Sequence, residues 1–215
     1  MSHPSSRNRA ALLVGPTGSG KTPLGDLIER RGLWQARCLH FDFGANLREI
    51  VQRDRPDEWL GRKEVEFLKD VLQTGALLEN ERLYVAEQIL RRFLAGRGAD
   101  PQTVLLLNGL PRHAGQADDV DAILDVQTVI LLRCSPETVA ARIRSNVGGD
   151  RTGRADDDPR SIARRLALFD ARTAPLLDRY RARGVKIHSI EVTAAMTADA
   201  MWQALDRGGS NCLWS

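Results

Sequence analysis

A glycine-rich loop near the N-terminus constrains the fold of this chain more than any other feature. Gly15, Gly20, Lys21 and Thr22 fit the pattern G-x-x-x-x-G-K-[ST] within the stretch LLVGPTGSGKTPLG. The short apolar run AALLVG precedes the loop, and a helical pattern follows it. In this context the glycines let backbone N–H groups converge on phosphates, and the positive end of the following helix adds to the attraction. The loop therefore predicts a site for a nucleoside triphosphate.

The residues of this loop have distinct expected roles. The candidates for binding the triphosphate, ATP or GTP, are Gly15, Gly18, Ser19, Gly20, Lys21 and Thr22. Lys21 is placed to reach the β- and γ-phosphates as a catalytic residue, and Thr22 is placed to hold Mg²⁺. Asp42, which ends the second apolar run, is a further candidate ligand for Mg²⁺, with a turn-forming role as the alternative.

Short apolar segments alternate with helical patterns along the whole chain. The segments AALLVG, ARCLHFDFG, TVLLLNG, TVILLRC and VKIHSIEV are typical of buried strands. This alternation predicts an α/β fold of the P-loop NTPase type, with a parallel five-stranded sheet and helices on both faces. We expect a single domain over residues 1–215, with its core at 9–43, 100–145 and 158–207. Residues 44–98 would form a helical insertion and residues 146–157 a short lid.

The overall composition argues against nucleic-acid and membrane partners and indicates a reducing compartment. The chain has 31 Lys and Arg against 28 Asp and Glu, a net charge of +3 without a basic stripe, so we expect no nucleic-acid partner. Cys38, Cys134 and Cys212 are far apart and are expected to be free thiols in a reducing compartment. Because the N-terminus is polar and no apolar run is long enough to span a bilayer, we expect a cytoplasmic protein without a membrane partner. We also expect a monomer.

Three arginines occupy positions that suit phosphate binding. Arg48 and Arg112 follow the second and third predicted strands, where open parallel sheets bind their ligands. Arg165 lies three residues after Ile162 and four before Phe169, so it shares the inward side of a predicted helix. An arginine on a buried side needs an anion to compensate its charge.

These stretches, together with the loop, resemble the adenylate kinase family of nucleoside monophosphate kinases. The segment GLPRHAGQADD resembles the family's G-F-P-R-x-x-x-Q-A stretch, and GANLRE resembles its G-D-x-L-R stretch. GALLENE is similar to the stretch that lines the family's base pocket, and GRADD…RRL…TAPLLDRY to its lid exit and following helix. The resemblance covers about the whole chain in order. The short lid without cysteines resembles the short form of the family, which implies no zinc.

The resemblance implies transfer of the γ-phosphoryl group of ATP to a nucleoside monophosphate, most commonly AMP, with Mg²⁺ bound to ATP. The residues that it implies for acceptor binding are Gly44, Arg48, Leu78, Gly109, Arg112 and Gln116. The implied catalytic residues are Lys21, Arg112, Arg142, Arg154 and Arg165. Of these, Arg142, Arg154 and Arg165 would close over the transferring group from the lid side.

Four positions depart from the family pattern. Asn108 stands where the family has an aspartate that helps hold magnesium, and Asn146 stands where it has a further arginine. Phe43 and Ala45 replace residues that neighbour the base or ribose of the acceptor. These departures leave three alternatives open: a kinase for UMP or CMP, a kinase for a small hydroxyl metabolite, and a nucleotide-binding sensor with weak or lost turnover. The intact phosphate-binding residues favour an enzyme.

Overall fold

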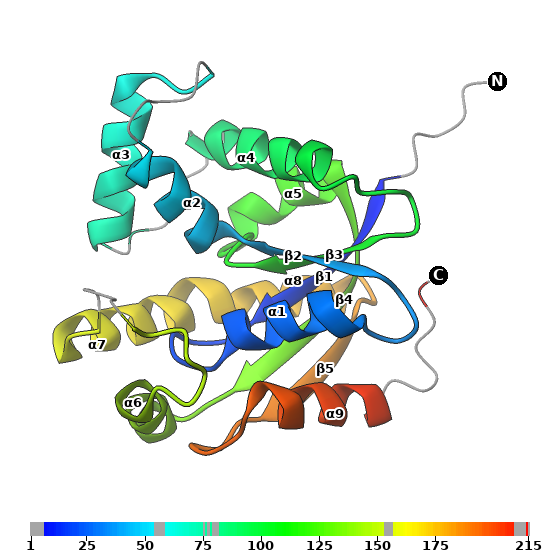
Figure 1. Ribbon diagram of the computed structural model, residues 1–215, viewed down its shortest axis with the longest axis vertical. Helices are drawn as coiled ribbons and strands as arrows, with labels where there is room; N and C mark the ends of the chain where they lie inside the picture. Colours follow the sequence, from blue (N-terminus) through cyan, green and yellow to red (C-terminus); the bar gives the residue numbers. More distant parts are fainter. Residues whose placement is uncertain are drawn as a thin grey trace.

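Five parallel strands form the centre of the protein, in the order β2-β3-β1-β4-β5 (Figure 1). The computed structural model describes residues 7–53, 59–74, 76, 78, 82–152, 157–208 and 214. The strands are β1 (Asn8–Val14), β2 (Cys38–Asp42), β3 (Val104–Asn108), β4 (Leu124–Arg133) and β5 (Lys186–Glu191). All four pairings between neighbours are parallel, which confirms the expected P-loop NTPase-type α/β fold.

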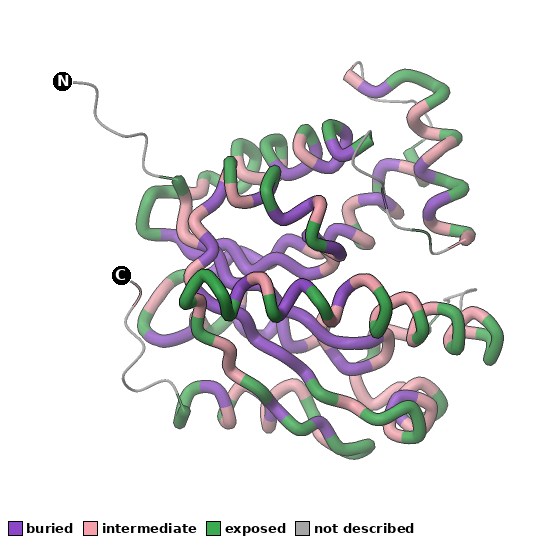
Figure 2. The backbone as a smooth tube through the Cα atoms, turned by 180° about the vertical axis from the view of Figure 1, so that it is seen from behind, coloured by how far each residue is buried: buried purple, intermediate pink, exposed green. Residues whose placement is uncertain are grey.

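Helices cover both faces of the sheet because the strands carry apolar residues on both sides. In β1, Ala10, Leu12 and Val14 belong to one buried cluster, whereas Ala11 and Leu13 belong to another. The second cluster is covered by α1 (Lys21–Arg31) and α9 (Ala198–Gly208). The first is covered by α4 (Leu83–Gly96), α5 (Ala114–Ile123) and α8 (Ala174–Ala182), so the strands are buried between the two layers (Figure 2).

The segment between β2 and β3 carries α2 (Phe43–Gln52), α3 (Arg62–Thr74) and α4, and α2 and α3 extend beyond the sheet (Figure 1). Helix α6 (Pro136–Ser145) follows β4 and ends at Asn146, which has φ 46°. Residues 153–156 of the expected lid lie outside the described residues. The division into core, insertion and lid stays a prediction.

A long helical segment begins at Pro159 and leads toward β5. It consists of α7 (Pro159–Leu168), a π-helical turn at Phe169–Thr173 (η2) and α8. The Asp158 side chain caps α7 by accepting from the N–H groups of Arg160 and Ser161. Among the residues described, no helix is both long enough and apolar enough to cross a membrane. Cys38 and Cys134 are free thiols, while Cys212 lies outside the described residues.

Candidate active site

A cavity of about 220 Å³ opens at the carboxyl ends of β1, β2 and β3. Parallel sheets place ligands at this edge because the loops that follow neighbouring strands converge there. The cavity brings together most residues that the sequence predicts for the site. Its walls include Gly15, Gly18, Gly20, Lys21, Thr22, Asp42, Gly44, Arg48, Leu78, Gly109, Arg112, Gln116 and Arg165.

The phosphate cradle is the loop from Gly15 to Thr22. Gly18 and Gly20 adopt φ 73° and 97°, a left-handed conformation that glycine reaches without steric cost. Lys21 Nζ donates to the carbonyl oxygens of Gly15 and Pro16, both at 2.7 Å, so the ammonium lies over the loop. No side chain caps the start of α1, which leaves its first N–H groups available to an anion.

Ser19 differs from the expectation for a side chain that binds ATP. It is fully buried and does not line the cavity. Its hydroxyl has no hydrogen-bond partner among the described residues, and its backbone N–H donates to Pro16 O at 3.3 Å. The structure therefore gives Ser19 a place inside the loop, behind the phosphate-binding surface.

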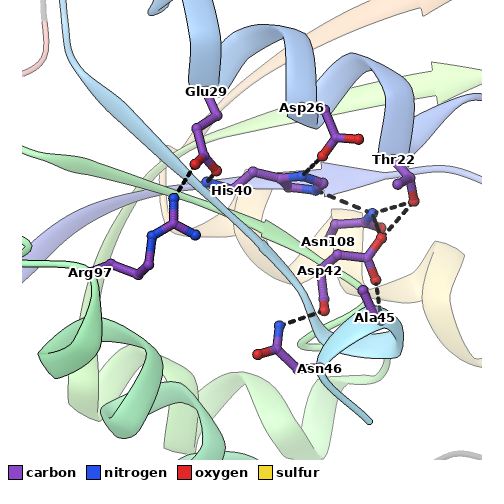
Figure 3. A network of polar contacts seen from close by, with 9 residues as sticks. All are labelled: Thr22, Asp26, Glu29, His40, Asp42, Ala45, Asn46, Arg97 and Asn108. Carbon is purple, nitrogen blue, oxygen red and sulfur yellow. Dashed lines mark hydrogen bonds and ion pairs between the residues drawn. The ribbon is translucent and has the colours of Figure 1, made fainter. Parts of the chain in front are cut away.

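Thr22, Asp42 and Asn108 meet at one edge of the cradle (Figure 3). The Thr22 hydroxyl donates to Asp42 Oδ2 at 2.6 Å, while Asp42 Oδ1 accepts from Ala45 N–H at 2.8 Å and caps α2. Asn108 Nδ2 donates to Asp42 Oδ2 at 3.0 Å and to Thr22 Oγ1 at 3.2 Å. Oδ1 therefore serves the turn-forming alternative, while Oδ2 lies beside the Thr22 hydroxyl, where the role in Mg²⁺ binding stays a prediction.

This edge fits the ligand preference of Mg²⁺. Magnesium takes oxygen ligands and commonly uses only one or two protein groups, with phosphate oxygens and water completing its shell. Thr22 and Asp42 supply a hydroxyl and a carboxylate beside the cradle. Asn108 directs its NH₂ group at both, so it orients these oxygens and does not offer its own.

A second row of polar side chains supports Asn108 and was missed from the sequence. His40 Nε2 lies 3.4 Å from Asn108 Nδ2, and His40 Nδ1 lies 2.8 Å from Asp26 Oδ1 (Figure 3). An acceptor Nε2 leaves the ring proton on Nδ1, which donates to the carboxylate. The signal in the sequence is Gly25, a helix-interior glycine: a Cβ there would lie 2.3 Å from His40 Nε2.

The cavity also holds three arginines, Arg48, Arg112 and Arg165. Burial lowers the pKa of Arg112 to about 10, and repulsion from Arg165 adds to this effect. Among the described residues, no ion pair joins Arg48 or Arg112 to a carboxylate. Arg165 lies 3.8 Å from Asp157, and its side chain is 11 % exposed, which confirms its expected inward position. Such a cluster of guanidinium groups is an anion site, and phosphate is the anion that their planar forks suit.

The wall next to Arg112 is built around Gln116. Its Oε1 accepts from Arg112 N–H at 2.7 Å and its Nε2 donates to Leu78 O at 2.7 Å. The buried His113 was also missed from the sequence, and its Nε2 lies 3.1 Å from the same Leu78 oxygen. Gln116 thus fixes the wall of the pocket with both ends of its amide. The apolar side chains that line this part of the cavity are Phe43, Leu47, Val71, Leu72 and Phe169, which suit a flat base.

Arg142 does not occupy the position that the family resemblance implies. Arg142 is 3 % exposed and does not line the cavity. Its Nε donates to Gly18 O at 3.1 Å, and burial lowers its pKa. The guanidinium therefore lies behind the loop, because carbonyl oxygens there accept its hydrogen bonds. Arg154 lies outside the described residues, whereas Arg151 lines the cavity, with its Nε donating to Asp157 at 2.9 Å.

Comparisons with known proteins identify relatives of this chain. The sequence profile of a family described as "AAA domain" matches residues 14–163. An adenylate kinase of Prochlorococcus marinus is 30% identical over 183 residues, which cover 82% of this chain and 85% of that protein. One from Stenotrophomonas maltophilia is 32% identical, covering 80% and 86% of the two chains. An adenylate kinase of Deinococcus radiodurans is 29% identical over 214 residues, covering 94% and 98%.

Proposed function

We propose AMP as the phosphate acceptor of this chain, which belongs to the adenylate kinase family and is a nucleoside monophosphate kinase. The reaction would then be ATP + AMP = 2 ADP. One observation carries the proposal: the triphosphate cradle and the Arg48–Arg112 pair line the same cavity, at the carboxyl ends of neighbouring strands. Two phosphate sites that face each other are what a phosphoryl transfer between nucleotides requires.

In the proposed reaction the arginines and the lysine position the phosphate groups and neutralise their negative charge. Arg48 and Arg112 hold the phosphate of the acceptor, and Lys21 leaves the Gly15 and Pro16 oxygens to follow the moving phosphoryl group. Arg165 approaches the same group from α7, and Arg154 keeps the role that the family resemblance implies for it. Phosphoryl transfer needs in-line placement and dispersal of charge more than it needs proton transfer. The repulsion between Arg112 and Arg165 favours the bound anion, since the anion compensates both charges.

We further propose that Mg²⁺ is bound with ATP by Thr22 and Asp42. When bound, it would neutralise charge on the β- and γ-phosphate oxygens. The support is the pair of hard oxygen donors at the edge of the cradle, which Asn108 orients. Neither nucleic acid nor membrane belongs to this proposal, and a cytoplasmic monomer remains the expectation.

AMP is proposed over other monophosphates on two grounds. The relatives that cover most of the chain are named adenylate kinase, and the acceptor wall offers apolar surface to a purine. Phe43 lines the cavity at a position where the family resemblance expects threonine. The choice of acceptor is therefore the point that an experiment has to decide.

The test measures ADP formation with Mg²⁺·ATP and each of AMP, UMP, CMP, GMP and dTMP. We expect AMP to give the highest kcat/KM and Lys21→Ala to abolish turnover with every acceptor. A higher kcat/KM with another monophosphate would refute AMP as the acceptor. Tight ATP binding without turnover on any acceptor would instead identify a nucleotide sensor.

A further inference from the structure

Arg142 is a buried cation that the proposed reaction does not use. It lies on α6, three residues after the buried Val139. Its Nη1 donates to Thr193 O at 2.8 Å and to Met196 O at 2.7 Å, in the connection between β5 and α9. Its Nε donates to Gly18 O at 3.1 Å, so one side chain ties the phosphate cradle to the far end of the chain.

The contacts of Arg142 fall on the two left-handed glycines of the cradle. Besides the bond to Gly18, its Nη2 would lie 2.8 Å from any Cβ at Gly20. The peptide that joins Gly18 to Ser19 is thus held at both ends, because Ser19 N–H donates to Pro16 O while Gly18 O accepts from Arg142. A peptide fixed in this way cannot rotate without breaking two hydrogen bonds. Both glycines line the cavity on the other side of the loop.

A buried guanidinium is retained only where its N–H groups find acceptors. Here backbone carbonyl oxygens accept them, and these oxygens belong to the segments that surround the cradle. The Arg142 side chain is buried and does not line the cavity. It therefore acts on the shape of the loop and not on the nucleotide directly.

We propose that Arg142 is a positioning residue that holds the Gly15–Thr22 loop in its phosphate-binding shape from behind. Its side chain is buried and does not line the cavity. The inference rests on the proposed function in one respect only, that this loop binds the triphosphate of ATP. It follows that Arg142 contributes to affinity for any triphosphate, whether or not a base is attached, since preorganisation lowers the entropy lost on binding.

The experiment compares two ligands, Mg²⁺·ATP and Mg²⁺·tripolyphosphate, the second of which lacks base and sugar. Their affinities are measured by calorimetry for the unmodified chain, Arg142→Met and Arg142→Lys, and kcat is measured at saturating ATP. Ser135→Ala is the matched control, because Ser135 caps the same helix by accepting from Thr138 N–H at 3.2 Å. The melting temperature of each variant reports its stability.

We expect Arg142→Met to weaken both ligands by the same factor, roughly 10- to 100-fold, with kcat at saturating ATP nearly unchanged. The affinities of Arg142→Lys should lie between those of the unmodified chain and those of Arg142→Met, because one ammonium group cannot reach every carbonyl oxygen that the guanidinium group reaches. Ser135→Ala should lower the melting temperature and leave both affinities unchanged. If Arg142→Met does not fold, the ratio of the two affinities in Arg142→Lys decides.

Three results would overturn the inference. Weaker ATP with unchanged tripolyphosphate would place Arg142 against the nucleoside. A lower kcat with unchanged affinities for both ligands would mean that Arg142 contacts the transferring phosphoryl group. If Ser135→Ala weakens both ligands as much as Arg142→Met does, the effect of Arg142 comes from the stability of α6 and not from its contact with the loop. These measurements do not depend on which monophosphate accepts the phosphoryl group, so a wrong acceptor would leave them interpretable.

Discussion

Asp42 joins the glycine-rich loop to α2 through the two oxygens of one side chain. Oδ2 accepts from the Thr22 hydroxyl at the ATP cradle, and Oδ1 caps α2, the helix that carries Arg48. Asn108 donates to the same Oδ2 and takes the place where the family resemblance expects an aspartate. A carboxylate at the end of β2 thus stands beside the amide at the end of β3.

Asp42→Ser separates the two roles of this residue. Serine caps a helix as well as aspartate does, so α2 should keep its start. It lacks the second oxygen and the charge, so we expect Mg²⁺ to increase ATP affinity about tenfold less than in the unmodified chain. Calorimetric titration of ATP with Mg²⁺ and with EDTA measures this ratio. An unchanged ratio would mean that Asp42 takes no part in metal binding.

Arg112→Met removes a charge that the fold alone does not favour. Without ligand, burial and repulsion from Arg165 disfavour the Arg112 guanidinium, so this variant should raise the melting temperature. With substrates, we expect kcat/KM for the acceptor to fall about 100- to 1000-fold, because a charge contact with the transferring group is lost. ATP affinity should stay within about twofold.

Arg160→Met is the matched control, since Arg160 lies on the exposed side of α7. This control should change neither the melting temperature nor kcat/KM for the acceptor. An equal loss of ATP binding in Arg112→Met would show that Arg112 serves the cradle and not the acceptor. A lower melting temperature would show that Arg112 has a structural anion partner.

Helical spacing on α6 predicts that Arg142 points inward but not which groups it contacts. Val139 and Arg142 share a face at i, i+3, and this places both side chains inward. The spacing does not reveal what the inward face meets, because Thr193 and Met196 are brought there only by the tertiary fold. His40 was missed for the same reason: its partners Asp26 and Asn108 come from α1 and β3.

At the level of elements, the strands and the cradle were predictable because each has a local cause. Buried parallel strands require continuous apolar runs, and the loop requires glycines at fixed spacing before a helix. The π-helical turn at Phe169–Thr173 has no such local signal. The stripe of Leu166, Phe169 and Thr173 fits an α-helix equally well, and the extra residue per turn shows only in three dimensions.

The π-helical turn carries a contact that we expect to matter for the acceptor. Thr173 Oγ1 donates to Arg112 O at 2.8 Å, which ties the turn to the loop that presents Arg112. Thr173→Val should cost about 1 kcal/mol of stability, or about 2–4 °C in melting temperature, because a buried acceptor loses its donor. The KM for the acceptor should rise about three- to tenfold as Arg112 loses its support, while ATP affinity stays unchanged.

Thr128→Val provides the comparison for Thr173→Val. Thr128 is also buried, and its Oγ1 donates to Lys186 O at 3.0 Å, but it lies in β4 and does not line the cavity. A similar loss of stability without a change in KM is expected. A raised KM in both variants would mean that stability, and not the link to Arg112, controls acceptor binding.

Over the whole molecule, the balance of charge changes when both substrates bind. The chain carries a net charge of only +3. Arg48, Arg112 and Arg165 nevertheless line one cavity, at the edge of the sheet where both phosphates are proposed to bind. Filling the cavity with polyphosphate removes their mutual repulsion. Ligand at about 100 times its Kd adds about 2.7 kcal/mol to the stability of the folded state. For a domain of this size, that raises the melting temperature by about 5–11 °C.

A bisubstrate analogue that joins two adenosines through a polyphosphate chain should exceed this rise at the same concentration, because it occupies the cradle and the arginine pair together. Scanning calorimetry of the unmodified chain with ATP and with the analogue measures the difference. In Arg112→Met the analogue should lose its advantage over ATP, while the rise with ATP alone remains. If ATP and the analogue raise the melting temperature equally in the unmodified chain, the second phosphate does not bind in this cavity. The acceptor site would then have to lie elsewhere, whatever the cradle binds.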